Sequence, residues 1–402
     1  MKVRISKSAL SGPVSAPPSK SMAHRMLISA GLCKGESKVH GIAPSEDILA
    51  TLDCLKQIGA SYTYDGNTVI INGAADKETE GMRELYCRES GSTLRFFIPL
   101  CLLDGKQTTL SGTEKLLSRP LSVYESICKA QGIQYHNNGK AITLKGTLTS
   151  GSYKIQGNIS SQFISGLMFA LPLLEGDSTI DIIPPIESCS YINLTIQALG
   201  EFGVEVKWLD ERTLYIPGGQ QYIPREVTVE GDYSNGAFFE ALNYLGDSVT
   251  VEGLRPGSIQ GDRVYRDYFP MLEKGTPTVH LADCPDLGPV LFALAAAKNG
   301  GVFTGTRRLR IKESDRGAAM AAELEKFGVT VQNGDNEITV SGKLCAPREM
   351  LYGHNDHRIV MSLAIICTKT GGVIDGAEAV KKSLPDFFDR LCKLSVEVMY
   401  EA

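Results

Sequence analysis

The sequence has few of the features that mark metal-binding, membrane or nucleic-acid-binding proteins. Its ten cysteines are dispersed, and no two have the C-x-x-C spacing of zinc and thioredoxin-like sites. Of its six histidines, only His354 and His357 approach the spacing of metal ligands, so we expect no metal. The longest apolar runs, such as 96–103, are too short to span a bilayer, and the first five residues lack the apolar core of a signal peptide.

An excess of basic residues is also missing. The formal net charge is −5 and the pI about 5.8, whereas a general nucleic-acid or membrane-surface binder needs a basic face. We therefore expect no nucleic-acid and no membrane partner, and any positive field must be local. The content of 43% hydrophobic and 22% charged residues is that of a globular protein. We expect the cysteines to be reduced thiols and the protein to be cytoplasmic.

The chain repeats a pattern of helix, glycine and paired strands. Helix-period stretches end in glycine at residues 59, 132 and 203, with spacings of 73 and 71 residues. Each glycine is expected to follow its helix in left-handed geometry, and a strand hairpin is expected after it. One unit is thus of mixed βαβαββ type. The same order of elements is common in ordinary α/β proteins, so both interpretations stay open at this point.

The repeat predicts an α/β protein of two domains. Three units fill residues 13–225, and the second half has room for three more. The last unit lacks a strand, which the N-terminal run 3–5 would supply, so the second domain is expected to comprise residues 1–12 plus 226–402. Prolines near residues 13–18 and at 224 mark two crossings between the domains. Two crossings predict a double hinge with the active cleft between the halves.

Short polar motifs that suit anionic ligands run along nearly the whole chain. Most combine Lys or Arg with Ser or Asp and open a helix-like stretch. Basic side chains, hydroxyl groups and free N–H groups at helix starts bind phosphate and carboxylate well. Seven motifs therefore suggest a pair of substrates with several negative charges. The motifs lie at 18–25, 89–95, 118–120, 160–162, 312–316, 355–358 and 382–386.

Each motif also has a simpler, structural interpretation. Lys20, Ser21 and Arg25 occupy the first turns of a helix, where the positive helix end favours anions. An ordinary serine-capped helix start explains the same residues equally well. Gly91 lets the backbone approach a ligand closely, yet its segment also fits a plain helix start.

The charged motifs of the second half carry the same ambiguity. Lys312 and Arg316 lie four residues apart with Glu313 between them, which suits a phosphate site with an acid/base group. A solvated charge cluster is the simpler explanation. Asp356 precedes an apolar helix and is well placed to cap it.

Taken in order, the motifs resemble those of one enzyme family. Seven segments are similar in order and spacing to those of the 5-enolpyruvylshikimate-3-phosphate synthases, also called 3-phosphoshikimate 1-carboxyvinyltransferases. Single motifs are unspecific, but seven in order along essentially the whole chain are highly specific. The resemblance implies the enolpyruvyltransferase fold, with two similar domains of three βαβαββ units each. The segments are P-P-S-K-S-x-x-H-R, S-G-S-T-L-R, S-R-P, S-S-Q-F, K-E-S-D-R, N-D-H-R and K-S-L-P-D-F-F.

The resemblance implies a reaction between two small anions. The enolpyruvyl group of phosphoenolpyruvate passes to the 5-hydroxyl of shikimate 3-phosphate, and phosphate leaves. Protonation of the methylene carbon makes an oxocarbenium-like centre, the hydroxyl attacks it, and the tetrahedral ketal phosphate then eliminates. No metal and no organic cofactor is implied, and we expect a monomer.

The resemblance also implies which residues bind and react. Asp286 is the implied base at the 5-hydroxyl and Glu313 the implied acid at the methylene, with Lys20 assisting. The alternative is that the two carboxylates share these roles. Lys20 and Gln162 are implied to contact both ligands. The other residues implied at shikimate 3-phosphate are Ser21, Arg25, Ser160, Ser161, Ser188, Asp286 and Lys312. Those implied at phosphoenolpyruvate are Gly91, Arg119, Arg316, Arg358 and Lys382.

Two positions depart from the usual pattern of this family. Glu89 and Arg308 stand where the family often has asparagine. Arg308 is a further candidate contact for shikimate 3-phosphate. Glu89 brings a carboxylate close to expected anions and is left out of the expected site.

Two other functions fit parts of the pattern. The sister enzyme that transfers enolpyruvyl to UDP-N-acetylglucosamine shares the fold and the donor, but has Lys-Asn where this chain has Lys20-Ser21. It also usually has a loop cysteine, and 111–118 contains none here. A non-catalytic anion-binding protein of the same fold is the second alternative, against which the pairing of Asp286 and Glu313 argues.

Overall fold

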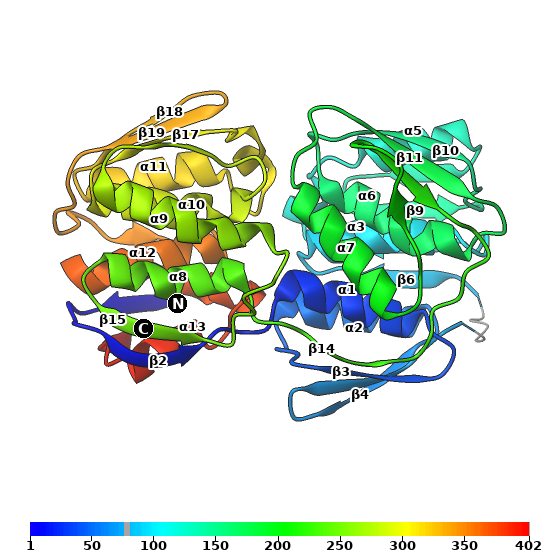
Figure 1. Ribbon diagram of the computed structural model, residues 1–402, viewed down its shortest axis with the longest axis horizontal. Coiled ribbons are helices and arrows are strands. Elements are labelled where there is room, and N and C mark those ends of the chain that lie inside the picture. Colours follow the sequence, from blue (N-terminus) through cyan, green and yellow to red (C-terminus); the bar gives the residue numbers. More distant parts are fainter. Residues whose placement is uncertain (76–80, 402) are drawn as a thin grey trace. The chain divides into compact units, whose positions relative to one another are not determined.

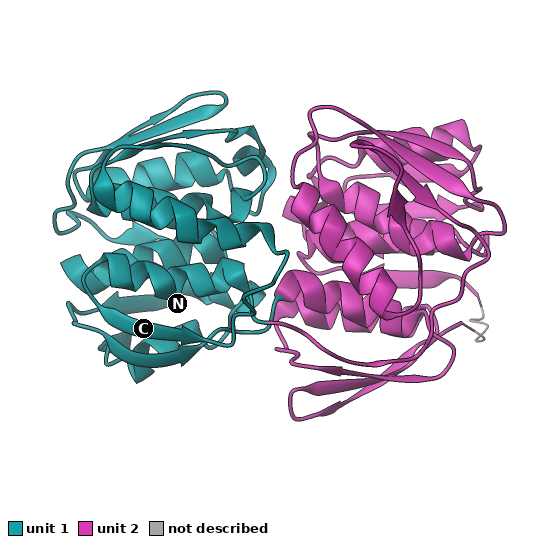
Figure 2. Cartoon of the chain, in the orientation of Figure 1, with its two compact units in different colours: residues 1–19, 231–402 teal, residues 20–230 magenta. Residues whose placement is uncertain are grey.

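The structure is a computed structural model that describes residues 1–75 and 81–401 of the chain. It divides into two compact units (Figures 1 and 2). Unit 2 is the continuous stretch Lys20–Glu230, whereas unit 1 combines Met1–Ser19 with Gly231–Ala402. Unit 1 therefore contains both the start and the end of the chain, as Figure 2 shows.

Unit 2 contains two complete copies of the expected βαβαββ repeat. In each copy the first two strands are parallel, and an antiparallel hairpin joins the second of them, so the sheet orders are β6-β7-β9-β8 and β10-β11-β13-β12. The first copy comprises β6 (Arg83–Tyr86), α3 (Gly91–Leu100), β7 (Thr108–Ser111), α4 (Glu114–Leu117), α5 (Ser122–Ala130), β8 (Gln134–Asn137) and β9 (Ala141–Lys145). The second comprises β10 (Ser152–Gln156), α6 (Ser161–Ala170), η1 (Leu171–Leu173), β11 (Ser178–Ile183), α7 (Cys189–Glu201), β12 (Lys207–Trp208) and β13 (Thr213–Ile216).

The remaining repeat of unit 2 is closed by a strand from the far end of the unit. Its sheet has the order β14-β3-β5-β4, and β14 is parallel to β3 although some 190 residues separate them. The repeat comprises α1 (Lys20–Gly31), β3 (Glu36–His40), α2 (Glu46–Gln57), β4 (Ser61–Asp65), β5 (Thr68–Asn72) and β14 (Glu226–Thr228).

Unit 1 also contains three repeats, but only one is continuous and complete. Its sheet has the order β16-β17-β19-β18. It comprises β16 (Thr278–His280), η3 (Pro285–Leu287), α10 (Gly288–Ala297), β17 (Gly301–Thr304), η4 (Arg307–Ile311), α11 (Arg316–Lys326), β18 (Thr330–Asn333) and β19 (Glu337–Ser341).

The N-terminal strand completes the last repeat, where the sequence analysis places it. β1 lies between β21 and β22 and is antiparallel to both. The repeat comprises β1 (Lys2–Ile5), β20 (Leu351–Tyr352), α12 (His357–Thr370), β21 (Gly372–Asp375), η5 (Ala377–Lys382), α13 (Phe387–Lys393) and β22 (Val398–Glu401).

The third repeat of unit 1 is shorter than expected. Its sheet has only two strands, because α9 leads after three residues into the first strand of the next repeat and leaves no room for a hairpin. The repeat comprises β2 (Ser11–Ser15), α8 (Tyr233–Tyr244), β15 (Ser248–Glu252), η2 (Gly261–Val264) and α9 (Tyr265–Lys274).

The unit boundaries differ by a few residues from those expected after residues 12 and 225. Strand pairing explains both differences. β2 pairs in parallel with β15 of unit 1, which carries the boundary forward to Ser19. β14 pairs with β3 of unit 2, which carries the other boundary to Glu230. The cleft expected between the two domains stays a prediction.

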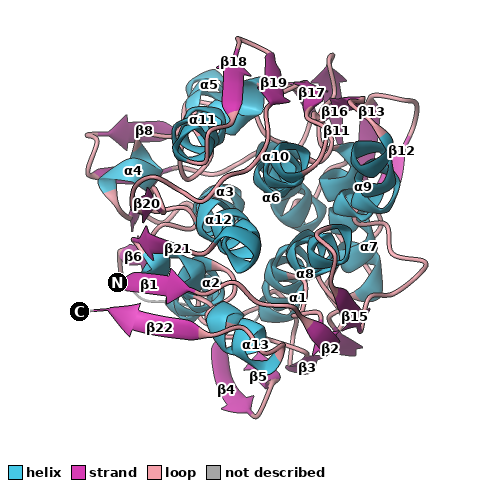
Figure 3. Ribbon diagram, turned by 90° about the vertical axis from the view of Figure 1, so that its left-hand side faces the viewer, coloured by secondary structure: helices cyan, strands magenta, loops and turns pink. Residues whose placement is uncertain are grey.

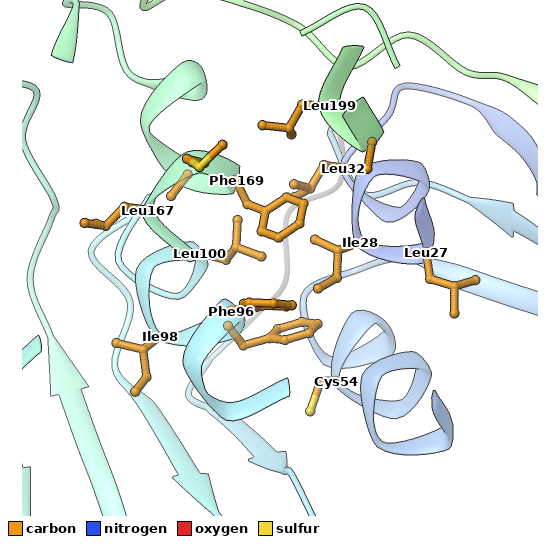
Figure 4. Packing of buried hydrophobic residues seen from close by; sticks show 14 of the residues in the cluster. Leu27, Ile28, Leu32, Cys54, Phe96, Ile98, Leu100, Leu167, Phe169 and Leu199 are labelled. Atoms are coloured by element: carbon orange, nitrogen blue, oxygen red, sulfur yellow. The ribbon is translucent and has the colours of Figure 1, made fainter. Parts of the chain in front are cut away.

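Three helices at the centre of each unit form its hydrophobic core. We call α1, α3, α6 in unit 2 and α8, α10, α12 in unit 1 the inner helices. They are buried along nearly their whole length, which fits helices that are apolar on all sides. Figure 4 shows Ile28, Phe96 and Phe169 from the three inner helices of unit 2 packed together, with ring centroids of the two phenylalanines 5.3 Å apart. Figure 3 shows α8, α10 and α12 surrounded by the strands of unit 1.

The glycines that follow α2, α5 and α7, which we call the outer helices of unit 2, have the predicted geometry. Gly59, Gly132 and Gly203 have φ angles of 107°, 67° and 79°. Side chains with a Cβ rarely adopt such angles, so glycine allows the chain to turn directly from helix to hairpin. These glycines therefore mark the same turn in each of the three repeats of unit 2.

Gly166→Ala is expected to destabilise the protein by about 1–3 kcal/mol, because it overpacks the contact between α3 and α6. A Cβ at Gly166 would collide with the Tyr124 hydroxyl and lie 2.5 Å from the Arg95 carbonyl oxygen. That hydroxyl donates to the carbonyl oxygens of Arg95 and Phe163, at 2.7 and 3.2 Å. Denaturant unfolding measures the change.

Gly200→Ala is the matched control, because it also lies in a helix but a Cβ there has no atom within 4 Å. It should leave stability unchanged or raise it by about 0.5–1 kcal/mol through helix propensity. Equal effects of the two substitutions would show that α3 and α6 do not approach each other at Gly166.

Candidate active site

Many of the residues singled out in the sequence lie at or just before helix starts, several of them at the starts of the inner helices. In unit 2, α1 begins at Lys20, α3 at Gly91 and α6 at Ser161. In unit 1, Asp286 lies two residues before α10, and Asp356 is the N-cap of α12. A helix start presents unpaired N–H groups and a partial positive charge, so each unit has several anion-binding ends.

Arg25 is a buried cation with only uncharged partners. Its side chain is 3% exposed and lies over the ring of Phe96, 5.3 Å from the centroid. It donates to Thr195 Oγ1 at 2.8 Å and to the Ser21 carbonyl oxygen at 2.7 Å. Two further bonds reach the Tyr191 carbonyl oxygen at 3.1 Å and Ser165 Oγ at 3.4 Å. Among the residues that the structure describes, no carboxylate pairs with it.

Burial lowers the pKa of Arg25 to about 10, so the guanidinium still carries its charge at neutral pH. A buried charge is costly unless an opposite charge balances it. The surroundings of Arg25 are therefore completed best by an anion.

Lys20 lies at the first position of α1 and is paired with an acid from the next helix. Its Nζ is 2.8 Å from Asp47 Oδ2, and both side chains are less than one-fifth exposed. The carbonyl oxygen of the next residue, Ser21, accepts a hydrogen bond from Arg25. The pair keeps an ammonium group and a carboxylate together at one helix start.

Gly91 faces a pair of arginines. A Cβ at this position would lie 2.9 Å from Arg119 Nη1, 3.1 Å from Arg95 Nη1 and 3.7 Å from Gln162 Oε1. Arg95 Nη1 donates to Gln162 Oε1 at 2.6 Å, and Gln162 Nε2 donates to Ser92 Oγ at 2.9 Å. Both arginines are less than one-tenth exposed. The absent side chain of Gly91 therefore lets the two guanidinium groups lie directly against the start of α3.

The serines expected at the acceptor phosphate lie at three helix starts, with Ser21 in the first turn of α1. Ser160 caps α6 and accepts from the Gln162 N–H at 3.3 Å, while Ser161 is the first residue of that helix. Ser188 precedes α7 in left-handed geometry, with φ of 58°. Because α7 packs against both α1 and α6, these serines and Arg25 belong to one end of unit 2.

In unit 1, the candidate residues form a connected network around Arg316. This side chain is 1% exposed and contacts three carboxylates. Its Nε is 2.9 Å from Asp356 Oδ2, its Nη1 2.7 Å from Asp286 Oδ1, and its Nη2 2.7 Å from Glu313 Oε2. Arg316 therefore holds both expected acid/base carboxylates in place.

Asp286 is surrounded by cations. Besides Arg316, Lys312 Nζ lies 3.2 Å from its Oδ1 and Arg358 Nη2 3.2 Å from its Oδ2. Burial alone would raise the pKa of Asp286, but Arg358, Lys312 and Arg316 hold it well below the usual range. Asp286 is thus ionised, and it becomes a stronger base whenever an anion takes over some of these cations.

The other charged candidates of unit 1 lie around this network. Burial lowers the pKa of Lys312, with Asp286 opposing and Arg308 adding to the decrease. Arg308 is 6% exposed, so this departure from the family pattern places a buried cation close to Lys312. Lys382 Nζ donates to the Asn355 carbonyl oxygen at 2.6 Å, beside the start of α12.

Three residues of the site escaped the sequence analysis. Asp47 was not singled out, although it pairs with Lys20. Arg95 stood in a motif but was not assigned a role, and it contacts Gln162. Asp356 was expected only to cap α12; it does so, accepting from the Arg358 N–H at 3.0 Å, but its other oxygen binds Arg316. In each case the partner lies far away in the sequence, so only the folded structure shows the contact.

A metal centre and a membrane span are both missing from the described part of the chain. Within residues 1–75 and 81–401, no group of three or more His, Cys, Asp or Glu side chains is arranged to hold a metal ion. In the same residues, no helix has the length and apolar character that crossing a bilayer requires.

Comparison with known proteins gives one consistent family. The family model described as EPSP synthase (3-phosphoshikimate 1-carboxyvinyltransferase) matches residues 5–274 and 270–391. The 3-phosphoshikimate 1-carboxyvinyltransferase of Clostridium kluyveri is 40% identical to the chain, with 98% of each covered. That of Clostridium novyi is 39% identical, with 96% of this chain and 95% of the relative covered.

Solved structures with the same fold support the architecture. EPSP synthase from Acinetobacter baumannii has a TM-score of 0.80 at 21% identity, with 100% of both chains covered. The enolpyruvyl transferase NikO from Streptomyces tendae has a TM-score of 0.78 at 15% identity, with 100% of this chain and 98% of the other covered. The fold is therefore that of the enolpyruvyl transferases, as expected. With the full-length match in sequence, the chain belongs to the EPSP synthase (3-phosphoshikimate 1-carboxyvinyltransferase) family, transferases of the shikimate pathway to the aromatic amino acids.

Proposed function

We propose that the chain transfers the enolpyruvyl group of phosphoenolpyruvate to the 5-hydroxyl of shikimate 3-phosphate and releases phosphate, using the residues at the starts of its inner helices. The single observation that carries this assignment of the site is the buried Arg25, whose guanidinium has only uncharged partners among the described residues. The 3-phosphate of the acceptor supplies the missing negative charge.

The acceptor phosphate is bound by unit 2. Ser160 and Ser161 offer hydroxyl groups and a helix start, and Arg25 offers a guanidinium fork that matches phosphate oxygens. Ser21 and Ser188 add hydroxyl groups at the starts of α1 and α7. Because these serine hydroxyl groups are neutral, they do not compete with the phosphate for the positive charge of Arg25.

The donor, phosphoenolpyruvate, uses cations from both sets of residues. In unit 2, Gly91 lets Arg119 approach the start of α3, so that its guanidinium group and the helix start together offer positive charge to a carboxylate or phosphate. In unit 1, Arg316, Arg358 and Lys382 supply positive charge, which stabilises the leaving phosphate.

The two carboxylates of unit 1 move the protons. Asp286 removes the proton of the 5-hydroxyl as it attacks, and Glu313 protonates the methylene carbon to form the tetrahedral ketal phosphate. In the elimination, the Glu313 carboxylate takes a proton back from the methyl group as the bond between the ketal carbon and the phosphate oxygen breaks and phosphate leaves. The cations on Asp286 keep it ionised before binding, and the arriving anions weaken their hold and raise its basicity.

Lys20 connects the two substrates. It stands at the first position of α1, and Asp47 holds its ammonium group. When two anionic ligands bind, they compete with Asp47 for this charge, so Lys20 assists in both binding and proton transfer.

We also propose that the protein acts in the cytoplasm and as a monomer. All ten cysteines are free thiols, which suits a reducing compartment. Sedimentation equilibrium at a mass near 43.5 kDa would agree with a monomer, and twice that mass would overturn it.

Release of phosphate with each candidate acceptor tests the reaction itself. With phosphoenolpyruvate present, turnover is expected on addition of shikimate 3-phosphate, and none with UDP-N-acetylglucosamine. Mass spectrometry of the product should show the added enolpyruvyl group. Turnover with the nucleotide sugar alone would assign the chain to the sister reaction, and no turnover with either acceptor would refute the proposal.

Arg25→Met is expected to weaken binding of shikimate 3-phosphate on the order of 100-fold while leaving thermal stability unchanged or improved. A charge-assisted bond to phosphate is lost, but so is an unbalanced buried charge, and Ser165 and Thr195 keep each other as partners at 2.7 Å. Calorimetric titration and thermal melting measure the two effects.

The matched control for Arg25 is the exposed Arg225 of the same unit, whose Nε donates to the Glu201 carbonyl oxygen at 3.3 Å. Arg225→Met should leave the affinity unchanged. A large drop in melting temperature for Arg25→Met would show instead that the guanidinium is a structural bridge.

Asp286→Asn and Glu313→Gln should each lower kcat by about 10²–10⁴-fold, the usual contribution of a general acid or base, with smaller changes in KM. Asp267→Asn on the exposed face of α9 serves as the control and should be silent. Steady-state kinetics with both substrates varied separates the constants. A change confined to KM would reassign both carboxylates to binding.

A further inference from the structure

The loop directly before α12 has two successive residues in left-handed backbone geometry. His354 and Asn355 have φ angles of 49° and 52°. Single histidines and asparagines adopt this geometry more readily than most residues with a Cβ, but two in succession persist only where other contacts hold them. The loop therefore depends on something that fixes it from outside.

Glu323 of α11 provides that contact. Its side chain is 2% exposed, and it binds three donors. Oε1 lies 2.8 Å from His354 Nε2, and Oε2 accepts from the backbone N–H of Tyr352 at 2.9 Å and from Lys326 Nζ at 2.8 Å. Two of these donors, the Tyr352 N–H and the His354 ring, belong to segment 352–356, so one buried carboxylate holds this segment at two points.

The charge of this carboxylate is secured by its partners. Burial alone would raise the pKa of Glu323, but the hydrogen bonds from His354, Lys326 and the Tyr352 N–H lower it below the usual value. Glu323 is therefore ionised at neutral pH. Charge-assisted bonds of this kind are about twice as strong as bonds between neutral groups.

The loop carries the contacts of three cations that the proposed function assigns to phosphoenolpyruvate. The Asn355 carbonyl oxygen accepts from Lys382 Nζ at 2.6 Å. Asp356, the next residue, binds Arg316 Nε at 2.9 Å and accepts from the Arg358 N–H at 3.0 Å. A shift of the loop therefore moves the partners of the Lys382 and Arg316 side chains and, through the cap on its backbone N–H, the start of α12 at Arg358.

We propose that Glu323 is a positioning residue for phosphoenolpyruvate, which acts by clamping the strained segment 352–356 and thereby sets the positions of Lys382, Arg316 and Arg358. This inference rests on the proposed function, because it takes these three cations as the donor site. Glu323 itself touches no substrate in this scheme. It also explains His354, which the sequence analysis considered only as a weak metal ligand.

A merely structural role would give a different pattern of effects. A buried carboxylate that only joins α11 to its surroundings would, when neutralised, lower the melting temperature and affect all kinetic constants alike. A clamp on the donor site instead raises the KM for phosphoenolpyruvate and leaves binding of shikimate 3-phosphate by unit 2 unchanged. The ratio of the two effects distinguishes the roles.

The test compares Glu323→Gln with Glu325→Gln in the full-length protein. Glu325 lies on the same helix two residues further on and is exposed, so it is a matched control for the loss of one charge. For Glu323→Gln we expect the KM for phosphoenolpyruvate to rise about tenfold, the effect of weakening one charge-assisted bond. The KM for shikimate 3-phosphate should stay within about twofold, and Glu325→Gln should match the wild type.

A second readout follows the clamp without any substrate. Nitrogen-15 NMR of the histidine rings should show the Nε2 signal of His354 shifting in Glu323→Gln, because that nitrogen loses its carboxylate partner, and staying in place in Glu325→Gln. An unchanged His354 signal would show that the contact with Glu323 is not formed in solution, which would overturn the inference.

His354→Asn keeps the experiment decisive if Glu323→Gln does not fold. Asparagine tolerates left-handed geometry, but its shorter side chain cannot reach Glu323. The KM for phosphoenolpyruvate should rise in this variant too, by a smaller factor. Wild-type turnover together with an unchanged KM for phosphoenolpyruvate in the folded variants would overturn the inference alone. Absence of wild-type turnover would overturn the proposed function and the inference with it.

Discussion

The burial of three apolar helices inside each unit is the constraint on which the site depends. Helices such as α3 and α6 pack so closely that glycine is required where they meet. Once these helices are fixed by the core, their starts are fixed as well, and each start has unpaired N–H groups and a positive end. Side chains that bind anions then need only occupy the first turn of an inner helix, or the residues just before it, to be held rigidly.

The two units balance their charges differently, and this difference divides the chemistry. In unit 2, Arg25 is buried among hydroxyl and carbonyl oxygens. In unit 1, Arg316 is buried against Asp286, Glu313 and Asp356, which orients the three carboxylates. We propose that the first arrangement serves the binding of a phosphate and the second the transfer of protons.

In unit 1, a segment with uncommon backbone geometry contacts two of the basic side chains of the candidate site. The loop at His354 and Asn355 is disfavoured by itself, yet it brings a carbonyl oxygen and a carboxylate to Lys382 and Arg316. A buried acid on a neighbouring helix offsets the strain. The packed core thus holds the Asn355 carbonyl oxygen and the Asp356 carboxylate at positions that the loop alone would not keep.

Much of the fold was predictable because its signals are local. Glycines after the outer helices, strand alternation and helix-start serines depend on residues within a few positions of each other, and the structure shows positive φ at Gly59, Gly132 and Gly203. The strand order was harder. Nothing near residue 226 indicates that β14 pairs with β3, or that β15 pairs with β2 and leaves its repeat with two strands. These pairings join segments that lie far apart in sequence, and so the expected domain boundaries fell several residues short.

By itself, the sequence determined the family, the repeat and the residue types at the helix starts, because ordered motifs and periodic apolar positions are written along the chain. Only the tertiary structure decided which charges meet. Asp47 pairs with Lys20 across 27 residues, and Arg316 contacts Asp286 and Asp356 from 30 and 40 residues away. Likewise, Glu323 looks like any helical glutamate until the core buries it beside His354. Burial and through-space contact, which set the strength of a charge and the partner it finds, exist only once the helices are packed.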